Sequence, residues 1–119
     1  MTDLPPSIVY KVCDRESWRA AEADGAFAGS ADDLRDGFIH LSTAEQLAGT
    51  LRRHFAGRSD LLLVAVATEA LQARLRWEPS RGGQLFPHLY GALDMRAVRS
   101  VTPITLGADG SHVLASGTG

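Results

Sequence analysis

Cysteine is almost absent from this chain, since Cys13 is the only one among its 119 residues. A single thiol allows no disulfide within the chain, and this scarcity is typical of proteins from a reducing compartment. Cys13 ends a run of residues with strand character, and no histidine lies near it in the sequence. We therefore expect an inert, buried thiol rather than a nucleophile.

The chain also lacks a long apolar run and an excess of positive charge. Its longest apolar run, Leu61–Ala67, is too short to cross a bilayer. The formal net charge of −2 predicts neither a nucleic-acid groove nor a polybasic membrane patch. Residues 1–7 do not show the charged and then apolar pattern of a signal peptide. We expect a cytoplasmic protein without membrane contacts.

Several well-known catalytic and binding motifs are missing as well. The sequence contains no Walker loop, no dinucleotide-binding fingerprint and no nucleophile elbow. His40, His88 and Glu78 together suit zinc or iron, and would make the chain a metal-dependent hydrolase. However, no closely spaced ligand pair such as His–x–x–x–His or Cys–x–x–Cys accompanies them. We therefore expect no metal, and the hydrolase is the last of three hypotheses.

What the sequence does contain is enough for one globular domain. Hydrophobic residues make up 45% of the chain and charged residues 22%, and its length can bury one sizeable core. We expect a flexible leader at 1–7, a single α+β domain at 8–106 and a flexible C-terminal tail at 107–119. Within that tail, Asp109–Gly110 favours a small hairpin turn.

Two helices and one helical turn are predicted in the first half of the chain, from N-cap residues and terminating glycines. The first helix is capped by Asp14, reaches about Asp24 and stops at Gly25. Residues 30–37 resemble a short turn that starts at a serine and ends at a glycine. The second helix ends at Gly57 and starts at two overlapping capping boxes, Ser42–x–x–Glu45 and Thr43–x–x–Gln46.

The strands are predicted from alternating or continuous apolar segments. Leu61–Ala67 is apolar on both faces, which is typical of an interior strand. Pro87 favours an edge or bulge position for segment 85–91, because proline cannot donate to a ladder. The remaining expected strands are 8–13, 38–41, 75–78 and 97–106. Together these elements predict an α+β domain with a mixed, mostly antiparallel sheet and two main helices.

A histidine lies in the middle of the expected strand 38–41, just before a helix start. Because side chains alternate along a strand, Phe38, His40 and Ser42 share one face. The unpaired N–H groups of a helix N-terminus attract anions there. His40, Ser42 and Thr43 could thus line a small polar pocket. Alternatively, His40 is half-buried and bonded to a neighbouring carbonyl, and one of the two hydroxyls caps the helix.

A second candidate group surrounds the end of the expected strand 75–78. Glu78 follows Trp77 at that strand end, where a carboxylate could act as a general base or stabilise positive charge on a sugar carbon. Alternatively, Glu78 is a surface carboxylate paired with Arg76 or Arg81. The segment Arg81–Gly82–Gly83 permits close approach to a ligand, or is simply a flexible turn.

The third candidate group is the extended segment 85–91. Phe86, His88 and Tyr90 share a face there, so the aromatic rings could stack a heteroaromatic ligand while His88 bonds to a hydroxyl. Alternatively, the two rings form a core pair around a satisfied histidine. His54, beside Arg52 and Arg53, is expected to be a solvated residue at a helix C-terminus.

Four segments together carry a family resemblance: Tyr10–Lys11–Val12, residues 37–43 (GFIHLST), Trp77–Glu78–Pro79 and residues 86–91 (FPHLYG). They resemble the bacterial domain-of-unknown-function family nine-five-two, and the resemblance extends from about Val9 to Pro103. That family is grouped with the ADP-ribosyltransferase fold, alongside RNA 2′-phosphotransferases and NAD-using toxins. The resemblance implies a split, curved mixed sheet whose cleft holds the nicotinamide end of NAD.

The resemblance also implies roles for individual residues. In the superfamily a polar residue holds a ribose hydroxyl, an aromatic ring stacks nicotinamide, and a late carboxylate steadies an oxocarbenium-like transition state. The first strand offers Tyr10 and Lys11 for the polar role, and Glu78 or His88 would replace the late acid.

Our leading hypothesis is an ADP-ribosyltransferase-like protein that binds NAD or a related nucleotide and, if it is an enzyme, cleaves the nicotinamide–ribose bond. The second is a non-catalytic binding or regulatory module. The proposed catalytic residues are His40, Glu78 and His88. The proposed ligand-binding residues are Tyr10, Lys11, Ser42, Thr43, Trp77, Arg81, Gly82, Gly83 and Tyr90.

Overall fold

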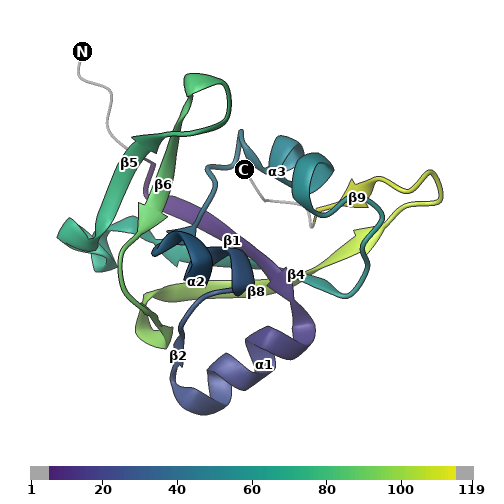
Figure 1. Cartoon of the computed structure of the whole chain (residues 1–119). Helices are drawn as coiled ribbons and strands as arrows, with labels where there is room; N and C mark the ends of the chain where they lie inside the picture. Colours follow the sequence, from purple (N-terminus) through teal and green to yellow (C-terminus); the bar gives the residue numbers. More distant parts are fainter. Residues whose placement is uncertain (1–5, 115–119) are drawn as a thin grey trace.

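The computed structural model describes residues 6–114, except for the side chain of Arg81. In this range the chain forms an α+β fold with three α-helices and three sheets, and every strand pair is antiparallel (Figure 1). The α+β class and the mostly antiparallel pairing are thereby confirmed, but the expected mixed sheet is wrong, because no parallel pair occurs among the described strands. The expectation of two main helices is corrected to three, because residues 31–36 form a helix of their own.

The largest sheet is four-stranded, and β4 lies inside it. Its strand order is β1-β4-β8-β9. All seven residues of β4 are buried, which confirms the predicted interior strand. The strands are β1 (Ile8–Asp14), β4 (Leu61–Ala67), β8 (Val98–Leu106) and β9 (His112–Val113).

The faces of this sheet are covered by α1 (Arg15–Asp24) and α3 (Leu47–His54), which lie on opposite sides of β1 and β4 (Figure 1). Alternate residues of β4 point to each side, so Val64 packs with the α1 core and Leu63 with the α3 core. The two cores share one strand, and β4 therefore fixes the positions of both helices.

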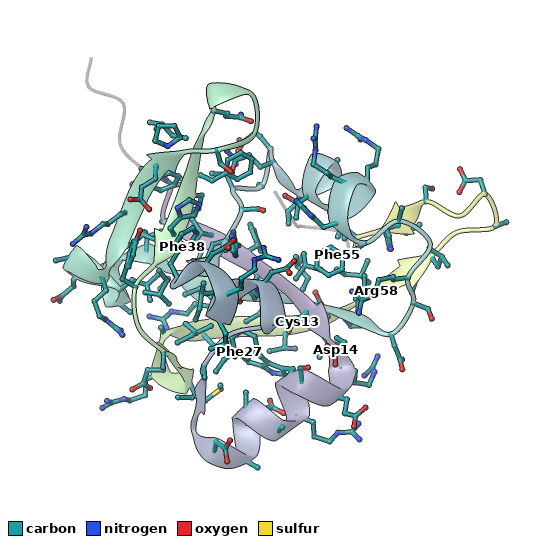
Figure 2. All side chains as sticks on the ribbon, in the orientation of Figure 1. Cys13, Asp14, Phe27, Phe38, Phe55 and Arg58 are labelled. Carbon is teal, nitrogen blue, oxygen red and sulfur yellow. The ribbon has the colours of Figure 1, made fainter. Side chains whose placement is uncertain are left out.

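The predicted boundaries of α1 are confirmed. The Asp14 carboxylate accepts a hydrogen bond from the Ser17 N–H at 2.7 Å, and Gly25 ends the helix with a φ of 86°. Cys13 and Phe27 lie in the interior between α1 and the sheet (Figure 2). Burial raises the pKa of the Cys13 thiol to about 12, which agrees with the expected inert role.

The other two sheets are smaller. The three-stranded sheet has the order β3-β6-β5, and the two-stranded sheet pairs β2 with β7. Their strands are β2 (Ala26–Phe27), β3 (Ile39–His40), β5 (Leu75–Pro79), β6 (Leu85–Leu89) and β7 (Leu93–Asp94). Short 3-10 turns connect them: η1 (Thr68–Ala70), η2 (Gln72–Arg74), η3 (Arg81–Gly83) and η4 (Met95–Ala97).

The predicted edge or bulge position of Pro87 is wrong, because β6 lies between β3 and β5. Pro87 pairs with Trp77 of β5, while its carbonyl accepts a hydrogen bond from the Leu41 N–H at 3.0 Å. Since proline has no N–H to return that bond, the regular β3 ladder stops at His40. The Pro87 ring therefore lies at the point where the pairing between β3 and β6 ends.

The helical turn predicted at 30–37 is confirmed as α2 (Ala31–Asp36). Ser30 and Asp33 form a capping box, and Gly37 ends the helix with a φ of 88°. The start of α3 was predicted too early. The Thr43 and Gln46 side chains do exchange bonds with each other's N–H groups, at 3.2 and 3.0 Å, but these bonds close a turn and the helix begins at Leu47.

The ends of the described range contact the body of the protein. The carbonyls of Pro6 and Ser7 accept hydrogen bonds from the Thr68 hydroxyl and N–H. At the other end, β9 pairs with β8 in the hairpin that Asp109–Gly110 predicted. The remainder of the expected leader and tail, residues 1–5 and 115–119, lies outside the described residues. Among the described residues, no helix is long and apolar enough to cross a membrane.

Candidate functional site

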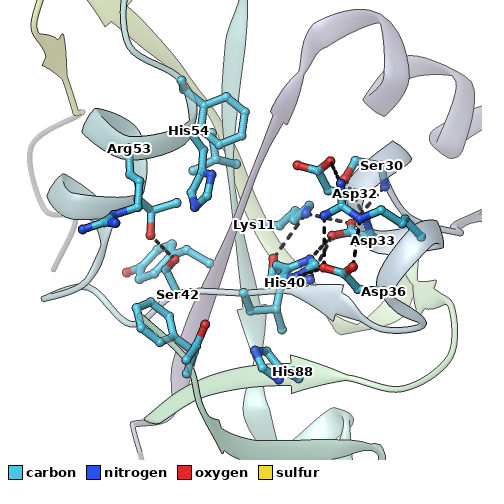
Figure 3. A pocket seen from close by; sticks show the side chains of 18 residues that line it. Lys11, Ser30, Asp32, Asp33, Asp36, His40, Ser42, Arg53, His54 and His88 are labelled. Atoms are coloured by element: carbon cyan, nitrogen blue, oxygen red, sulfur yellow. Dashed lines mark hydrogen bonds and ion pairs between the residues drawn. The ribbon is translucent and has the colours of Figure 1, made fainter. Parts of the chain in front are cut away.

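A cavity of about 330 Å³ surrounds the outer edge of β1. This edge is open because β1 pairs with β4 on one side, while Tyr10 and Ser42 form a single bridge on the other. Figure 3 shows β1 running between two groups of side chains. Ser42, Arg53 and His54 lie on one side, and Lys11, Asp33 and His40 on the other.

Lys11, the only lysine in the chain, is the centre of the second group. Its residue is 5% exposed, and its Nζ lies 2.8 Å from Asp33 Oδ2 and 3.2 Å from the His40 carbonyl oxygen. A buried ammonium needs such partners, because an unpaired charge in the interior is costly. The ion pair therefore joins α2 to β1.

His40 contacts two carboxylates of α2. Its Nδ1 lies 2.6 Å from Asp33 Oδ1, and its Nε2 lies 3.0 Å from Asp36 Oδ2. A carboxylate can only accept, so both ring nitrogens must donate for both bonds to form. Both ring nitrogens of His40 thus lie against α2. His40 is half-buried as expected, but its ring partners are carboxylates rather than the expected neighbouring carbonyl.

Asp33 is the acceptor that holds this network together. Besides Lys11 and the His40 ring, it accepts bonds from the backbone N–H groups of Ser30 and His40, at 2.9 and 3.1 Å. Burial by itself raises the pKa of Asp33, but the His40 hydrogen bond and the Lys11 charge together outweigh it and hold that pKa well below its usual range. Asp33 is thus a buried anion with several cationic or N–H donors around it.

His88 lies on β6, opposite His40 in the strand register, and the two ring centroids are 5.7 Å apart. Its Nδ1 lies 2.8 Å from Glu78 Oε1, which also accepts a hydrogen bond from the Tyr90 hydroxyl at 2.8 Å. Because the carboxylate accepts, the proton of a neutral His88 lies on Nδ1. Its Nε2 has no partner among the described residues and is not one of their buried unpaired atoms.

Phe38 connects the two histidines. Its ring stacks on His88 at a centroid distance of 4.0 Å and lies 4.7 Å from the His40 ring. The same ring approaches Tyr90 at 5.4 Å. The stacked Phe38 ring fixes the plane of His88, while Glu78 fixes the tautomer of its neutral form. His88 is 5% exposed and lines the cavity, so the cavity wall contains a pre-oriented imidazole.

Glu78 itself does not line the cavity. Two hydrogen bonds lower the pKa of Glu78, and the one from His88 has a larger effect than the one from Tyr90. The alternative of a surface ion pair with Arg76 is not observed, since the Arg76 guanidinium lies over the Tyr90 ring at 4.9 Å. Glu78 does not reach the cavity itself and can affect it through its contact with His88.

The two hydroxyls after His40 differ in what they do. Thr43 caps the turn before α3, as one of the two readings predicted. The Ser42 hydroxyl lines the cavity and lies 2.8 Å from the Thr50 hydroxyl of α3. Ser42 therefore closes the cavity between β1 and α3.

The structure brings together only part of the predicted site. Tyr10, Lys11, His40, Ser42 and His88 line the cavity, as does Phe86. Glu78 and Tyr90 lie behind His88. The others lie elsewhere: Thr43 in the turn, Trp77 against the core, Gly82 at a second hollow, Gly83 in η3, and Arg81 in η3 with its side chain outside the described structure.

Several lining residues were missed by the sequence reasoning. Asp33 and Asp36 could have been found from one signal, because a lone lysine inside an apolar strand needs a buried counter-charge. His54, expected to be solvated, is exposed at the end of α3 and also lines the cavity. Val12 and Arg53 carried no signal, since an apolar strand residue and a helical arginine are unremarkable in sequence.

No group of three His, Cys, Asp or Glu side chains among the described residues is arranged to hold a metal ion. His40 directs both ring nitrogens to carboxylates of α2, so the pair does not present two free nitrogens to one ion. The geometry gives the metal-dependent hydrolase no support.

The fold and the cavity together define a small α+β protein with a polar hollow at an open sheet edge and two histidines in its wall. The chain belongs to the family described as "Protein of unknown function (DUF952)", whose profile matches residues 12–101. The predicted family is thereby confirmed. Its grouping with ADP-ribosyltransferases stays a prediction.

Solved structures of one relative are similar over nearly the whole chain. The crystal structure of protein CC0527 from Caulobacter crescentus is 48% identical, covers 90% of this chain and 94% of its own, and has a TM-score of 0.86. The solution NMR structure of CC0527 is 47% identical, covers 89% and 91%, and has a TM-score of 0.80. None of the curated proteins compared with the chain matches it.

Proposed function

We propose that the cavity binds NAD or a related nucleotide, with the nicotinamide end at the open edge of β1. This proposal adopts the ADP-ribosyltransferase-like fold that the family resemblance implies. The observation that carries it is the combination, in one cavity, of an open strand edge, an oriented histidine and a fixed network of ion-paired side chains around Asp33.

At the open edge of β1, the backbone N–H and carbonyl of Val12 complement the carboxamide of nicotinamide. Tyr10 directs both its N–H and its carbonyl outward to Ser42, at 2.8 and 2.9 Å. In an antiparallel pair this direction alternates, so Val12 directs its N–H and carbonyl to the same outer edge. No described residue outside β4 bonds to the backbone of Val12. A primary carboxamide offers one acceptor and one donor, which is the complementary pair.

His88 suits the ribose next to that ring. The free Nε2 of His88 accepts from a ribose hydroxyl, or from a water molecule that attacks the sugar. In the cleavage reaction the bond between the ribose carbon and the nicotinamide nitrogen breaks, and the nitrogen keeps the electron pair. Water adds to the carbon and passes one proton to His88 Nε2, from which the proton leaves to solvent. Glu78 then acts as a positioning residue, because it touches His88 and not the cavity.

A second candidate, binding without cleavage, is favoured by the state of the carboxylates. Asp33, Asp36 and Glu78 each already contact donors within the protein: Asp33 contacts Lys11 and His40, Asp36 contacts Arg35 and His40, and Glu78 contacts His88 and Tyr90. A carboxylate that steadies a developing positive charge must face the reacting carbon. The arrangement therefore fits a nucleotide-binding module as well as an enzyme.

One set of measurements separates these candidates. Isothermal calorimetry with NAD and ADP-ribose tests binding, and a nicotinamide-release assay tests cleavage. Heat together with release supports the enzyme, and heat without release supports the binding module. Neither heat nor release with the wild-type protein would remove both.

The carboxamide pairing has its own test, which needs no mutation. The dinucleotide that carries nicotinic acid presents a second acceptor in place of the amide donor, so the Val12 carbonyl would lose its partner. We expect this analogue to bind about tenfold more weakly than NAD. Equal affinity for the two would contradict a nicotinamide at Val12.

A further inference from the structure

A second hollow of about 570 Å³ adjoins the first, and Arg53 of α3 lines both. Beside Arg53 this hollow is lined by Arg52, by Glu45 and Gln46 before α3, and by Gly82 and Gln84. A Cβ placed on Gly82 would meet no atom within 4 Å, so the space beside the η3 turn is open. One guanidinium therefore stands between two adjacent hollows.

Arg52 and Arg53 differ from most other arginines in the chain. The others with printed contacts meet carboxylates, carbonyls or aromatic rings: Arg15, Arg35, Arg96, Arg74, Arg99, Arg58 and Arg76. Within the described part of the chain, Arg52, Arg53 and Arg19 have no partner of these kinds. Arg53 extends away from the Asp33 network in Figure 3. Its donors therefore have no partner of these kinds between residues 6 and 114.

The wall of the second hollow is held in place by Gln46, which is 6% exposed. Its side-chain amide donates to the Leu85 carbonyl at 2.8 Å and accepts from the Thr43 N–H at 3.0 Å. These bonds attach the start of α3 to β6. Arg53 thus projects from a helix whose position is fixed relative to His88.

We propose that Arg53 and Arg52 form the subsite for a diphosphate, so that the ligand is a dinucleotide with one half in each hollow. This subsite rests on the proposed function, in which the first cavity holds the nicotinamide end of the ligand and not its diphosphate. A guanidinium presents a planar set of donors that matches phosphate oxygens. In the first cavity, Lys11, Arg35 and the His40 ring contact Asp33 or Asp36, and Asp32 pairs with Arg35.

Glu45 is the acidic group in the second hollow, where two guanidinium groups face one carboxylate. The balance of charge there is positive, whereas the chain as a whole carries a formal net charge of −2. An anion is therefore attracted to this hollow against the average charge of the protein.

The test uses Arg53→Gln, with Arg19→Gln as a matched control that removes the same charge from exposed α1. Inorganic pyrophosphate is titrated while the arginine Nε–Hε signals are followed by NMR, and NAD and nicotinamide riboside are titrated by calorimetry. We expect pyrophosphate to shift the Arg52 and Arg53 signals. Arg53→Gln should weaken NAD about tenfold and leave the phosphate-free riboside unchanged, and Arg19→Gln should weaken neither.

The two proposals fail in different ways in this experiment. Wild-type protein that binds pyrophosphate at Arg53 but gives no heat with NAD would remove the proposed function and keep an anion site. Protein that binds NAD equally well with Arg53→Gln and Arg19→Gln would overturn the diphosphate subsite alone. Pyrophosphate shifts of equal size at Arg19 and Arg53 would also overturn it, because they indicate a general charge effect.

Discussion

His40 and His88 face each other in the strand register, yet their surroundings differ in kind. His40 lies between two carboxylates of α2, and both its nitrogens are used. His88 lies among aromatic rings, and within the described part of the chain only its Nδ1 has a partner, Glu78. The comparison shows that the same residue type can hold a fold together at one position and remain available to a ligand at the next strand.

The difference arises from the elements behind each ring. Behind His40 is α2, whose Asp33 is also the counter-charge of buried Lys11. Behind His88 is β5, whose Glu78 is partly solvated with a side chain 35% exposed. Substitutions around His40 should therefore destabilise the fold, whereas substitutions around His88 should change ligand binding. The following predictions test that contrast.

The largest effect is expected from Asp33→Asn. The change leaves the Lys11 ammonium buried without its counter-charge, and removing one partner of a buried pair costs about 3–5 kcal/mol of unfolding free energy. Urea denaturation measures the loss. Adding Lys11→Met to Asp33→Asn should recover part of it. The control is Asp36→Asn, which removes an exposed carboxylate from the other side of His40, and an equal loss in this variant would contradict the contrast.

The acid side of the stability profile should depend on the same carboxyl. The pKa of Asp33 is lowered in the folded protein, so its stabilising contribution is complete above the ordinary value near 3.8 and is lost as the pH falls below it. Between about pH 5 and pH 2, the stability difference between wild type and Asp33→Asn should therefore shrink. A difference that stays constant over this range would show that Asp33 is not the group responsible.

On the other side of the comparison, Glu78→Ala should change ligand binding more than folding. Without Glu78 the His88 ring loses the acceptor that keeps its proton on Nδ1, and we expect NAD affinity to fall about tenfold. The nitrogen chemical shifts of His88 should report the change of tautomer. Tyr90→Phe, which removes the other donor to Glu78 but leaves the His88 contact, should keep both the shifts and the affinity close to wild type.

The smallest effect is expected at the hydroxyl that closes the cavity opposite the histidines. Ser42→Ala removes the contact with the Thr50 hydroxyl and should cost about 1 kcal/mol in thermal or urea unfolding. Thr43→Ala, which removes the adjacent cap, should cost a similar amount. Because only Ser42 lines the cavity, only Ser42→Ala should also alter affinity. Equal changes in affinity for both variants would show that the effect is transmitted through α3.

Local signals predicted a good part of the fold. Asp14 and Gly25 bound α1 as expected because a cap and a terminating glycine act within a few residues of themselves. The buried β4 was predicted for a similar reason, since a strand that is apolar on both faces has no solvent side. The start of α3 was misplaced because Gln46 bonds to Leu85, which lies far away in sequence, as well as to Thr43.

The candidate site was predicted only in outline. The alternation of side chains placed Phe38, His40 and Ser42 on one face, and Phe86, His88 and Tyr90 on another. The sequence does not show that Asp33 lies against Lys11, or that Arg53 stands between two hollows, because these contacts depend on how α2 and α3 pack against β1.

The sequence by itself determined the family, the α+β class, the limits of α1 and the choice of two histidines as the residues to examine. Only the tertiary structure decided that one of them is enclosed by carboxylates and the other keeps a free nitrogen. The physical reason is the separation along the chain over which each interaction acts. Capping, alternation and glycine turns act between neighbours in the chain, whereas the charge partners of a side chain are chosen by the packing of elements that are distant in sequence.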